Sequence, residues 1–154
     1  MLLPKGWRSP ARSRSASGMG ITKVDAQVSH WTGSGVTIPV TLLVDSGASY
    51  SVLPASVWQQ LGLVADEHLD FNLADGTIIT RGVSECRFTI GGRTATSPVV
   101  LGRDDEGPLV GAVTLETLRL VLNPLTRRLM PMRLLLASMT PRAAADFPAS
   151  ISAS

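Results

Sequence analysis

Apolar and polar residues alternate along much of the chain between residues 19 and 136, and this period of two predicts β-strands. The clearest run falls in residues 36–44, where every second side chain is aliphatic: Val36, Ile38, Val40, Leu42 and Val44. Pro39 has no backbone N–H to donate, so it predicts a sheet edge or a bulge at that point. The pattern therefore predicts a strand that delivers Asp45 at its end and turns one face to the core.

Further strands are predicted on both sides of glycine-containing turns. They are expected at 21–28, 71–73, 77–79, 85–90, 93–101 and 128–132. The Asp75-Gly76 pair is a strong hairpin signal, and Gly91-Gly92 predicts a second turn. Seven or eight short strands of this kind imply a mainly β, barrel-like domain.

Two short helices are predicted within this β pattern. The first begins at Pro54 and stops at Gly62, because proline suits a first helical turn and glycine suits a helix end. The second is expected at 114–122, where Leu115, Leu118 and Leu122 fall on one helical face.

Composition divides the chain into one domain and two tails. The 154 residues are 44% hydrophobic and 17% charged, which suits one globular core. Residues 1–18 carry four basic residues, no acid and no apolar periodicity, so a disordered basic tail is predicted. Residues 137–154 are rich in Ala, Ser and Pro and predict a second tail, which leaves 19–136 as the domain. Met19 opens the patterned region and is an alternative start to Met1.

Charge and hydropathy argue against nucleic-acid and membrane partners. Residues 19–136 contain nine basic and eleven acidic residues, so the N-terminal tail supplies the basic excess and the domain sequence shows no basic face. No apolar run reaches the roughly 18 residues that a membrane-spanning helix needs. Pro4 and Lys5 interrupt the apolar stretch that a signal peptide would require.

Cysteine and histidine suggest no metal site. Cys86 is alone, so it can form no intrachain disulfide and no cysteine-based metal cluster. His30 and His68 lie far apart without the spacing of metal ligands. We therefore expect no metal and no other cofactor. The single cysteine fits a reducing compartment, and a cytoplasmic location is predicted.

The segment 43–54 contains the candidate catalytic residue. It places an acid, Asp45, on a Ser46-Gly47 turn after an apolar strand. One buried carboxylate is costly, but two held a few ångströms apart share a proton. The ionised member can take a proton from a water, and the protonated member can polarise a substrate carbonyl. Such a pair hydrolyses peptide bonds without a metal or a covalent intermediate.

The same segment resembles the active-site region of retropepsin-like aspartic proteases of the bacterial type. It reads Leu43-Val44-Asp45-Ser46-Gly47-Ala48, followed by Val52-Leu53-Pro54. Residues 73–77 resemble the flap region of that family, and 109–111 its apolar-apolar-Gly motif before a C-terminal helix. Residues 120–124 and 128–131 resemble its closing segment. The matching segments follow one another in the same order as in the family, across residues 19–136.

This resemblance implies a closed, single-lobe acid-protease barrel that acts as a homodimer on a peptide or protein substrate. Each subunit would give one catalytic Asp45. Ser46 would help to lock the two active-site loops together, and Gly47 would allow the turn that Ala48 follows. The implied flap residues are Ala74, Asp75, Gly76 and Thr77. The residues implied to pack beneath the loop are Leu109, Val110 and Gly111.

The chain departs from the family pattern in two places. Position 46 is Ser rather than the commoner Thr, and the flap lacks the multiple glycines of viral members. A bilobal arrangement would need a second Asp-Ser/Thr-Gly motif, which the sequence does not contain. Asp45 must therefore meet its own copy across a two-fold axis.

Several alternatives stay open from the sequence. Asp45 can be a turn-former, and Asp75-Gly76 an ordinary hairpin turn. The fold can serve as a noncatalytic dimeric module that binds peptides, or the basic tail can target the domain to acidic partners. The acidic residues 104–106 are interpreted as a solvated loop, and Cys86 as a buried structural thiol.

Overall fold

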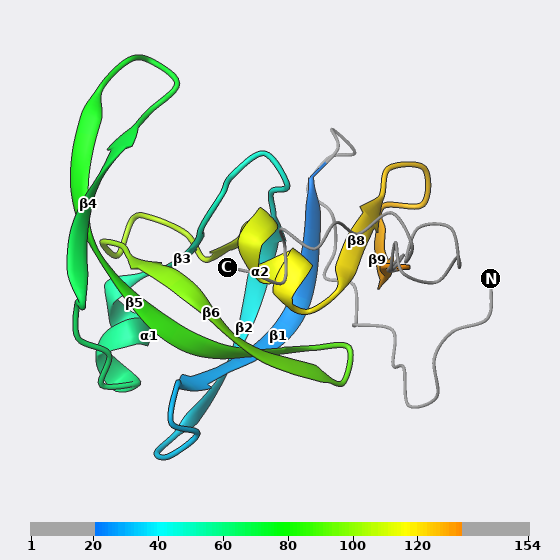
Figure 1. Cartoon of the computed structure of the whole chain (residues 1–154), viewed down its shortest axis with the longest axis horizontal. Helices are drawn as coiled ribbons and strands as arrows, with labels where there is room; N and C mark the ends of the chain where they lie inside the picture. Colours follow the sequence, from blue (N-terminus) through cyan, green and yellow to red (C-terminus); the bar gives the residue numbers. More distant parts are fainter. Residues whose placement is uncertain (1–20, 134–154) are drawn as a thin grey trace, which may run out of the picture.

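Residues 21–133, the part of the chain described by the computed structural model, fold into nine strands and two short helices (Figure 1). In chain order these are β1 (Thr22–His30), β2 (Thr37–Val44), β3 (Ser51–Leu53), α1 (Ala55–Gln60), β4 (Glu67–Asn72), β5 (Ile78–Ile90), β6 (Arg93–Leu101), β7 (Leu109–Val110), α2 (Ala112–Thr117), β8 (Leu120–Asn123) and β9 (Arg128–Pro131). The two predicted tails and Met19 lie outside the described residues.

Seven strands form one sheet that curls into a ring. Their order is β1-β2-β7-β3-β6-β5-β4, and an additional antiparallel pairing of β1 with β5 closes the ring of six strands. β4 pairs only with β5 and so stands outside the ring. The prediction of a mainly β, single-lobe fold is confirmed.

Aliphatic side chains fill the inside of the ring. The fully buried residues include Val28, Leu42, Phe88, Val99 and Val110, from five different strands. Phe88 is the one aromatic residue in this buried cluster, among the residues described. Burying a side chain of this size contributes roughly 1.5–3 kcal/mol of stability, so the core rests on many medium-sized contacts.

The alternating pattern of β2 is reproduced in the structure. Leu42 and Val44 are buried and Ile38 and Val40 half-buried, while the alternate positions Thr37, Pro39 and Thr41 are exposed. Pro39 lies opposite Gln27 of β1, whereas β7 pairs only with Leu43 and Val44. The missing N–H of Pro39 therefore faces a side where no strand pairs within the described residues, which confirms the prediction of an edge.

The second predicted helix, at 114–122, is wrong in its extent. α2 covers Ala112–Thr117, and the chain then reverses at Arg119, whose φ is 56°. Leu120 is buried and Val121 exposed, which is the period of a strand, and β8 pairs with β9 in antiparallel register. Strand pairing with residues 128–131 overrides the helical spacing of the leucines. The spacing could not predict this pairing, because the partner strand lies outside the segment that contains the leucines.

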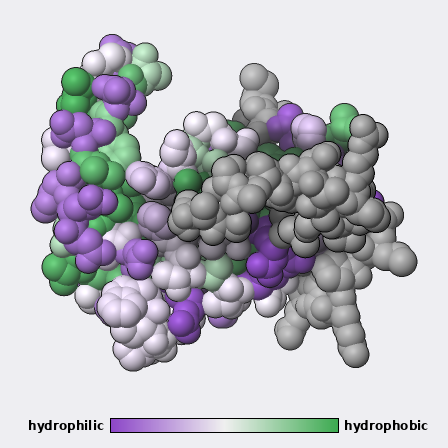
Figure 2. Space-filling model, viewed as in Figure 1, coloured by the Kyte–Doolittle hydropathy of each residue, from purple (hydrophilic) through white to green (hydrophobic). Residues whose placement is uncertain are grey.

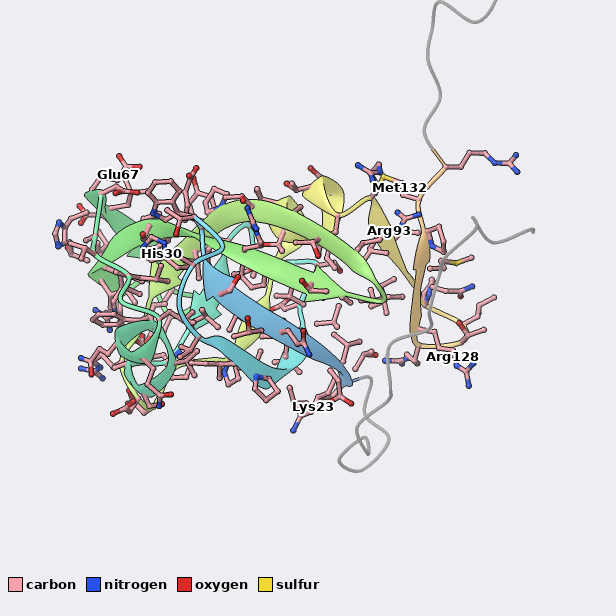
Figure 3. The ribbon with its side chains drawn as sticks, turned by 90° about the horizontal axis from the view of Figure 1, so that it is seen from below. Lys23, His30, Glu67, Arg93, Arg128 and Met132 are labelled. Carbon is pink, nitrogen blue, oxygen red and sulfur yellow. The ribbon has the colours of Figure 1, made fainter. Side chains whose placement is uncertain are left out.

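The β8–β9 pair forms a separate two-stranded sheet at one end of the molecule. Figure 3 shows Arg93 and Arg128 beside this end, while Glu67 of β4 lies at the opposite end. Arg93 donates hydrogen bonds from Nη1 to the carbonyls of Leu118 and Arg119, at 3.1 and 2.8 Å. The first bond serves the carbonyl at the C-cap of α2, where no further helical turn supplies a donor, whereas the Arg119 carbonyl also accepts from the Met132 amide at 2.8 Å.

Within residues 21–133, no helix is long and apolar enough to cross a membrane. The same residues contain no group of three or more His, Cys, Asp or Glu side chains placed to hold a metal ion.

Candidate active site

Asp45 lies immediately after β2, on a turn that holds its own carboxylate. The amide of Gly47 donates to Asp45 Oδ1 at 3.0 Å, and the amide of Ala48 donates to the Asp45 carbonyl at 3.2 Å. The Asp45 amide donates in turn to the carbonyl of Val110 in β7, at 3.0 Å. The half-buried carboxylate is therefore fixed by local backbone bonds and by a neighbouring strand.

The first amides of α2 hold the rest of the candidate active-site loop, residues 45–50. The amide of Ala112 donates to the Ala48 carbonyl at 2.8 Å, and that of Val113 to the Ser49 carbonyl at 3.0 Å. Amides in the first turn of a helix have no partner within the helix, so they are available for this contact. β7 and α2 thus support the loop from the inner side of the domain.

Gly111, between β7 and α2, lies directly against this loop. A Cβ atom at this position would come within 2.7 Å of the backbone C and O atoms of Tyr50 and within 2.9 Å of the Ala48 carbonyl oxygen. Its φ of −101° is open to any residue, so the requirement for glycine is steric. Leu109 and Val110 pair with Leu43 and Val44, one step before Asp45.

Three buried hydroxyl groups lie beneath the loop, and sequence reasoning did not single them out. Thr114 of α2 hydrogen-bonds through Oγ1 to Ser51 Oγ of β3 and to Ser97 Oγ of β6. Ser51 Oγ also accepts a hydrogen bond from the Gly111 amide at 3.0 Å. All three hydroxyl-bearing residues are buried. The network ties two strands to the helix whose first amides bind the loop, and no local sequence signal joins residues so far apart.

Removing the central hydroxyl of this network is expected to destabilise the domain. Thr114→Val keeps the side-chain shape but leaves Ser51 and Ser97 without their shared partner, which should lower the free energy of unfolding by about 1–3 kcal/mol. Thr114→Ser, which keeps the hydroxyl, should stay within about 1 kcal/mol of the wild type. Chemical denaturation of both variants measures the difference, and equal stability would contradict a role for the network.

The predicted flap residues form the tip of the β4–β5 hairpin, which projects beyond the ring (Figure 1). The amide of Leu73 donates to the Thr77 carbonyl at 2.8 Å, and the amide of Gly76 donates to the Leu73 carbonyl at 2.9 Å. Gly76 has a φ of 86°, which glycine adopts without strain. Ala74 and Asp75 lie between these positions. Hydrogen bonds from the Thr77 side chain and amide lower the pKa of the Asp75 carboxyl.

A groove of about 420 Å³ lies between the hairpin and the active-site loop, and Figure 2 shows an open hollow on this side of the hairpin. Gly47, Ala48 and Tyr50 line it from the loop, and Phe71, Leu73 and Ile79 from the hairpin. The rings of Tyr50 and Phe71 meet edge to face with centroids 6.1 Å apart. The groove is therefore walled largely by apolar side chains next to the Asp45 turn. A second hollow of about 610 Å³, beside Pro39 and Gly91, is lined by no residue of the 45–50 loop and none of the projecting segment 67–81.

An ion pair closes one side of the groove, and it corrects the sequence interpretation of residues 104–106. Arg81 of β5 donates from Nε and Nη2 to the two carboxylate oxygens of Glu106, at 2.9 and 3.0 Å. The Arg81 guanidinium lowers the pKa of the Glu106 carboxyl, and Glu106 raises the pKa of Arg81. Asp105 is exposed as expected, but Glu106 is not simply solvated. Its partner lies 25 residues away, beyond the reach of local patterns.

The structure agrees with the interpretation of Cys86 as a buried structural thiol. The side chain is fully buried, and this burial raises the pKa of the thiol to about 12. A thiol with such a pKa is a poor nucleophile at neutral pH.

The family comparison agrees with this geometry. The family model described as Aspartyl protease matches residues 24–114, more than half of the chain. The matched region runs from β1 to α2 and contains the Asp45 loop, the hairpin and Gly111. The chain therefore belongs to this retropepsin-like aspartyl protease family. A comparison with curated proteins gives no match.

Proposed function

We propose that this protein is an aspartic endopeptidase that works as a homodimer, with one Asp45 from each copy. The observation that carries the proposal is the setting of Asp45. Its carboxylate is held by the Gly47 amide on a turn, and Gly47 and Ala48 of the same turn line a groove that a hairpin borders. Membership of the aspartyl protease family supports the same chemistry. The sequence has one Asp-Ser-Gly motif, so the second carboxylate must come from a second copy.

The proposed reaction is general acid–base hydrolysis by the two Asp45 carboxyl groups. Close together they hold one proton between them. The ionised group takes a proton from a water, whose oxygen attacks the carbonyl carbon of the peptide bond. The protonated group donates to the carbonyl oxygen. When the tetrahedral intermediate collapses, the first carboxyl group gives the nitrogen the proton that it took from water, and the C–N bond breaks. The second group takes a proton back from one hydroxyl of the intermediate, which leaves a carboxylic acid, a free amine and the pair with its one proton.

The hairpin and groove suit an extended peptide as substrate. An extended chain can present alternate side chains to the apolar wall formed by residues such as Val52, Ile79 and Leu109. The hairpin would cover the bound peptide and exclude water from the reacting groups. Leu73 and Ile78 of the hairpin are exposed in the single chain and would gain cover from a substrate or a second copy.

Cleavage of a denatured protein, with and without an aspartic-protease inhibitor, tests the proposal when solution mass is measured on the same sample. We expect inhibitor-sensitive cleavage by a particle of twice the chain mass. A folded dimer that binds peptides but cleaves none would instead favour the noncatalytic binding module. A protein that remains monomeric at all concentrations would contradict both.

A further inference from the structure

The β4–β5 hairpin leaves the ring at a defined point. Residues 78–81 of β5 pair only with β4, whereas β6 joins β5 from Gly82 onward, where Gly82 lies opposite Leu101. Arg81 is the last residue of β5 before β6 joins it. The angle of the hairpin relative to the ring is therefore set near Arg81 and Gly82.

Gly82 marks a close approach at this point. A Cβ atom there would lie 2.8 Å from the Cβ of Ala65, in the segment before β4. The backbone of the hairpin base is thus packed closely on one side. On the groove side, side chains of the hairpin contact the rest of the domain: the Phe71 ring meets Tyr50, and Arg81 binds Glu106.

Arg81 and Glu106 are well suited to hold this angle. The contact is bidentate, and the side chains are only 17% and 26% exposed. Glu106 Oε1 also accepts a hydrogen bond from the Arg103 amide at 2.7 Å, which fixes the carboxylate in its loop. Bidentate, charge-assisted bonds between partly buried groups are among the stronger and more directional polar contacts.

The loop that carries Glu106 leads directly to the strand beneath Asp45. It continues through Gly107 and Pro108 into β7, and the Pro108 carbonyl accepts a hydrogen bond from the Leu43 amide at 3.0 Å. Two residues later the Val110 carbonyl accepts from the Asp45 amide. The ion pair therefore connects the base of the hairpin with the backbone that positions Asp45.

We propose that the Arg81–Glu106 ion pair is a strut that sets the position of the hairpin over the Asp45 loop. Both side chains are positioning residues that act through the hairpin. The strut acts on the site described above by positioning the hairpin, so its effect on cleavage rests on the proposed function. Its effect on hairpin position does not.

Two single variants, their double variant and one matched control test the strut. Arg81→Met and Glu106→Gln remove the charge of one partner each, and the double variant removes both. Asp105→Asn is the control, because Asp105 pairs with Arg103 in the same loop at 3.4 Å, but with both side chains about 70% exposed. Exposed pairs of this kind contribute little. Circular dichroism confirms that each variant is folded, and if Arg81→Met fails to fold, the near-isosteric Glu106→Gln decides.

Hairpin position is read from the distance between spin labels on cysteines introduced at Asp75, on the hairpin tip, and at Glu116, exposed on α2. Cys86 is buried and does not compete for the label. Dilution with unlabelled protein restricts the signal to pairs within one chain. We expect a broader distance distribution for Arg81→Met and Glu106→Gln, no further broadening in the double variant, and a wild-type distribution for Asp105→Asn.

Kinetics provide the second measurement. A loosely held hairpin should raise KM about fivefold, since binding must also order the hairpin, and should change kcat less. Wild-type distance distributions in both single variants would overturn the strut, whatever their activity. A wild-type protein that cleaves nothing would count against the proposed function alone, because the distance measurement still decides the strut.

Discussion

Asp45→Asn should abolish peptide cleavage while leaving the fold and the dimer intact. Asparagine has nearly the same size and can still accept the hydrogen bond from the Gly47 amide, but it cannot take a proton from water. Loss of a general base lowers rates by about 10²–10⁴-fold, and here both copies would lose the group, so we expect at least about 10³-fold. Initial rates on one peptide substrate, with circular dichroism and solution mass, provide the measurement.

Asp25→Asn is the matched control for this experiment. Asp25 lies on β1, is exposed, and accepts a hydrogen bond from the Thr41 hydroxyl at 3.2 Å. It lines the second hollow and none of the groove beside Asp45. The control should cleave at the wild-type rate. Wild-type cleavage by Asp45→Asn would end the catalytic proposal. Equal losses of cleavage in both variants would show that the effect is not specific to Asp45.

Gly111→Ala should produce the largest loss of stability. The added methyl group would meet backbone atoms of Tyr50 and Ala48, which cannot rotate away as a side chain can. Either the active-site loop or the start of α2 must shift, and we expect the free energy of unfolding to fall by about 3 kcal/mol or more. Urea denaturation measures the change, and cleavage should fall with it because the displaced loop carries Asp45.

Gly62→Ala separates steric from conformational cost. Gly62 follows α1 with a φ of 74°, and a Cβ there would meet no atom within 4 Å. Its replacement should cost about 1 kcal/mol through backbone strain alone. A cost for Gly111→Ala that does not exceed that of Gly62→Ala would show that the loop is not packed as tightly as the distances indicate.

Features that depend on neighbouring residues were accessible from the sequence. The alternation of residues 36–44 predicted β2 with Asp45 at its end, and Asp75-Gly76 predicted the hairpin turn. Proline at position 39 predicted the unpaired side of β2. Each signal arises from the intrinsic geometry of one short segment, so no knowledge of distant contacts was needed.

Features that depend on distant partners were not accessible. The helical spacing of Leu115, Leu118 and Leu122 gave no hint that residues 128–131 would pair with 120–123 as a strand. Contacts between distant side chains could not be predicted for the same reason. Ser51 and Thr114 are 63 residues apart, and Arg81 and Glu106 are 25 apart. Serine, threonine and charged residues are common on surfaces, so only the closed ring reveals which of them meet.

The central claim is that two copies of Asp45 form one active site, and mixed dimers test it most directly. Wild-type protein is unfolded and refolded together with a tenfold excess of Asp45→Asn, and cleavage is measured per wild-type chain. If pairing is random, only roughly a tenth of the wild-type chains find a wild-type partner, so activity should fall to about a tenth. The same excess of Asp25→Asn, which can complete the site, should cause no such loss. Full activity per wild-type chain in the presence of Asp45→Asn would show that one chain suffices and would contradict the shared site.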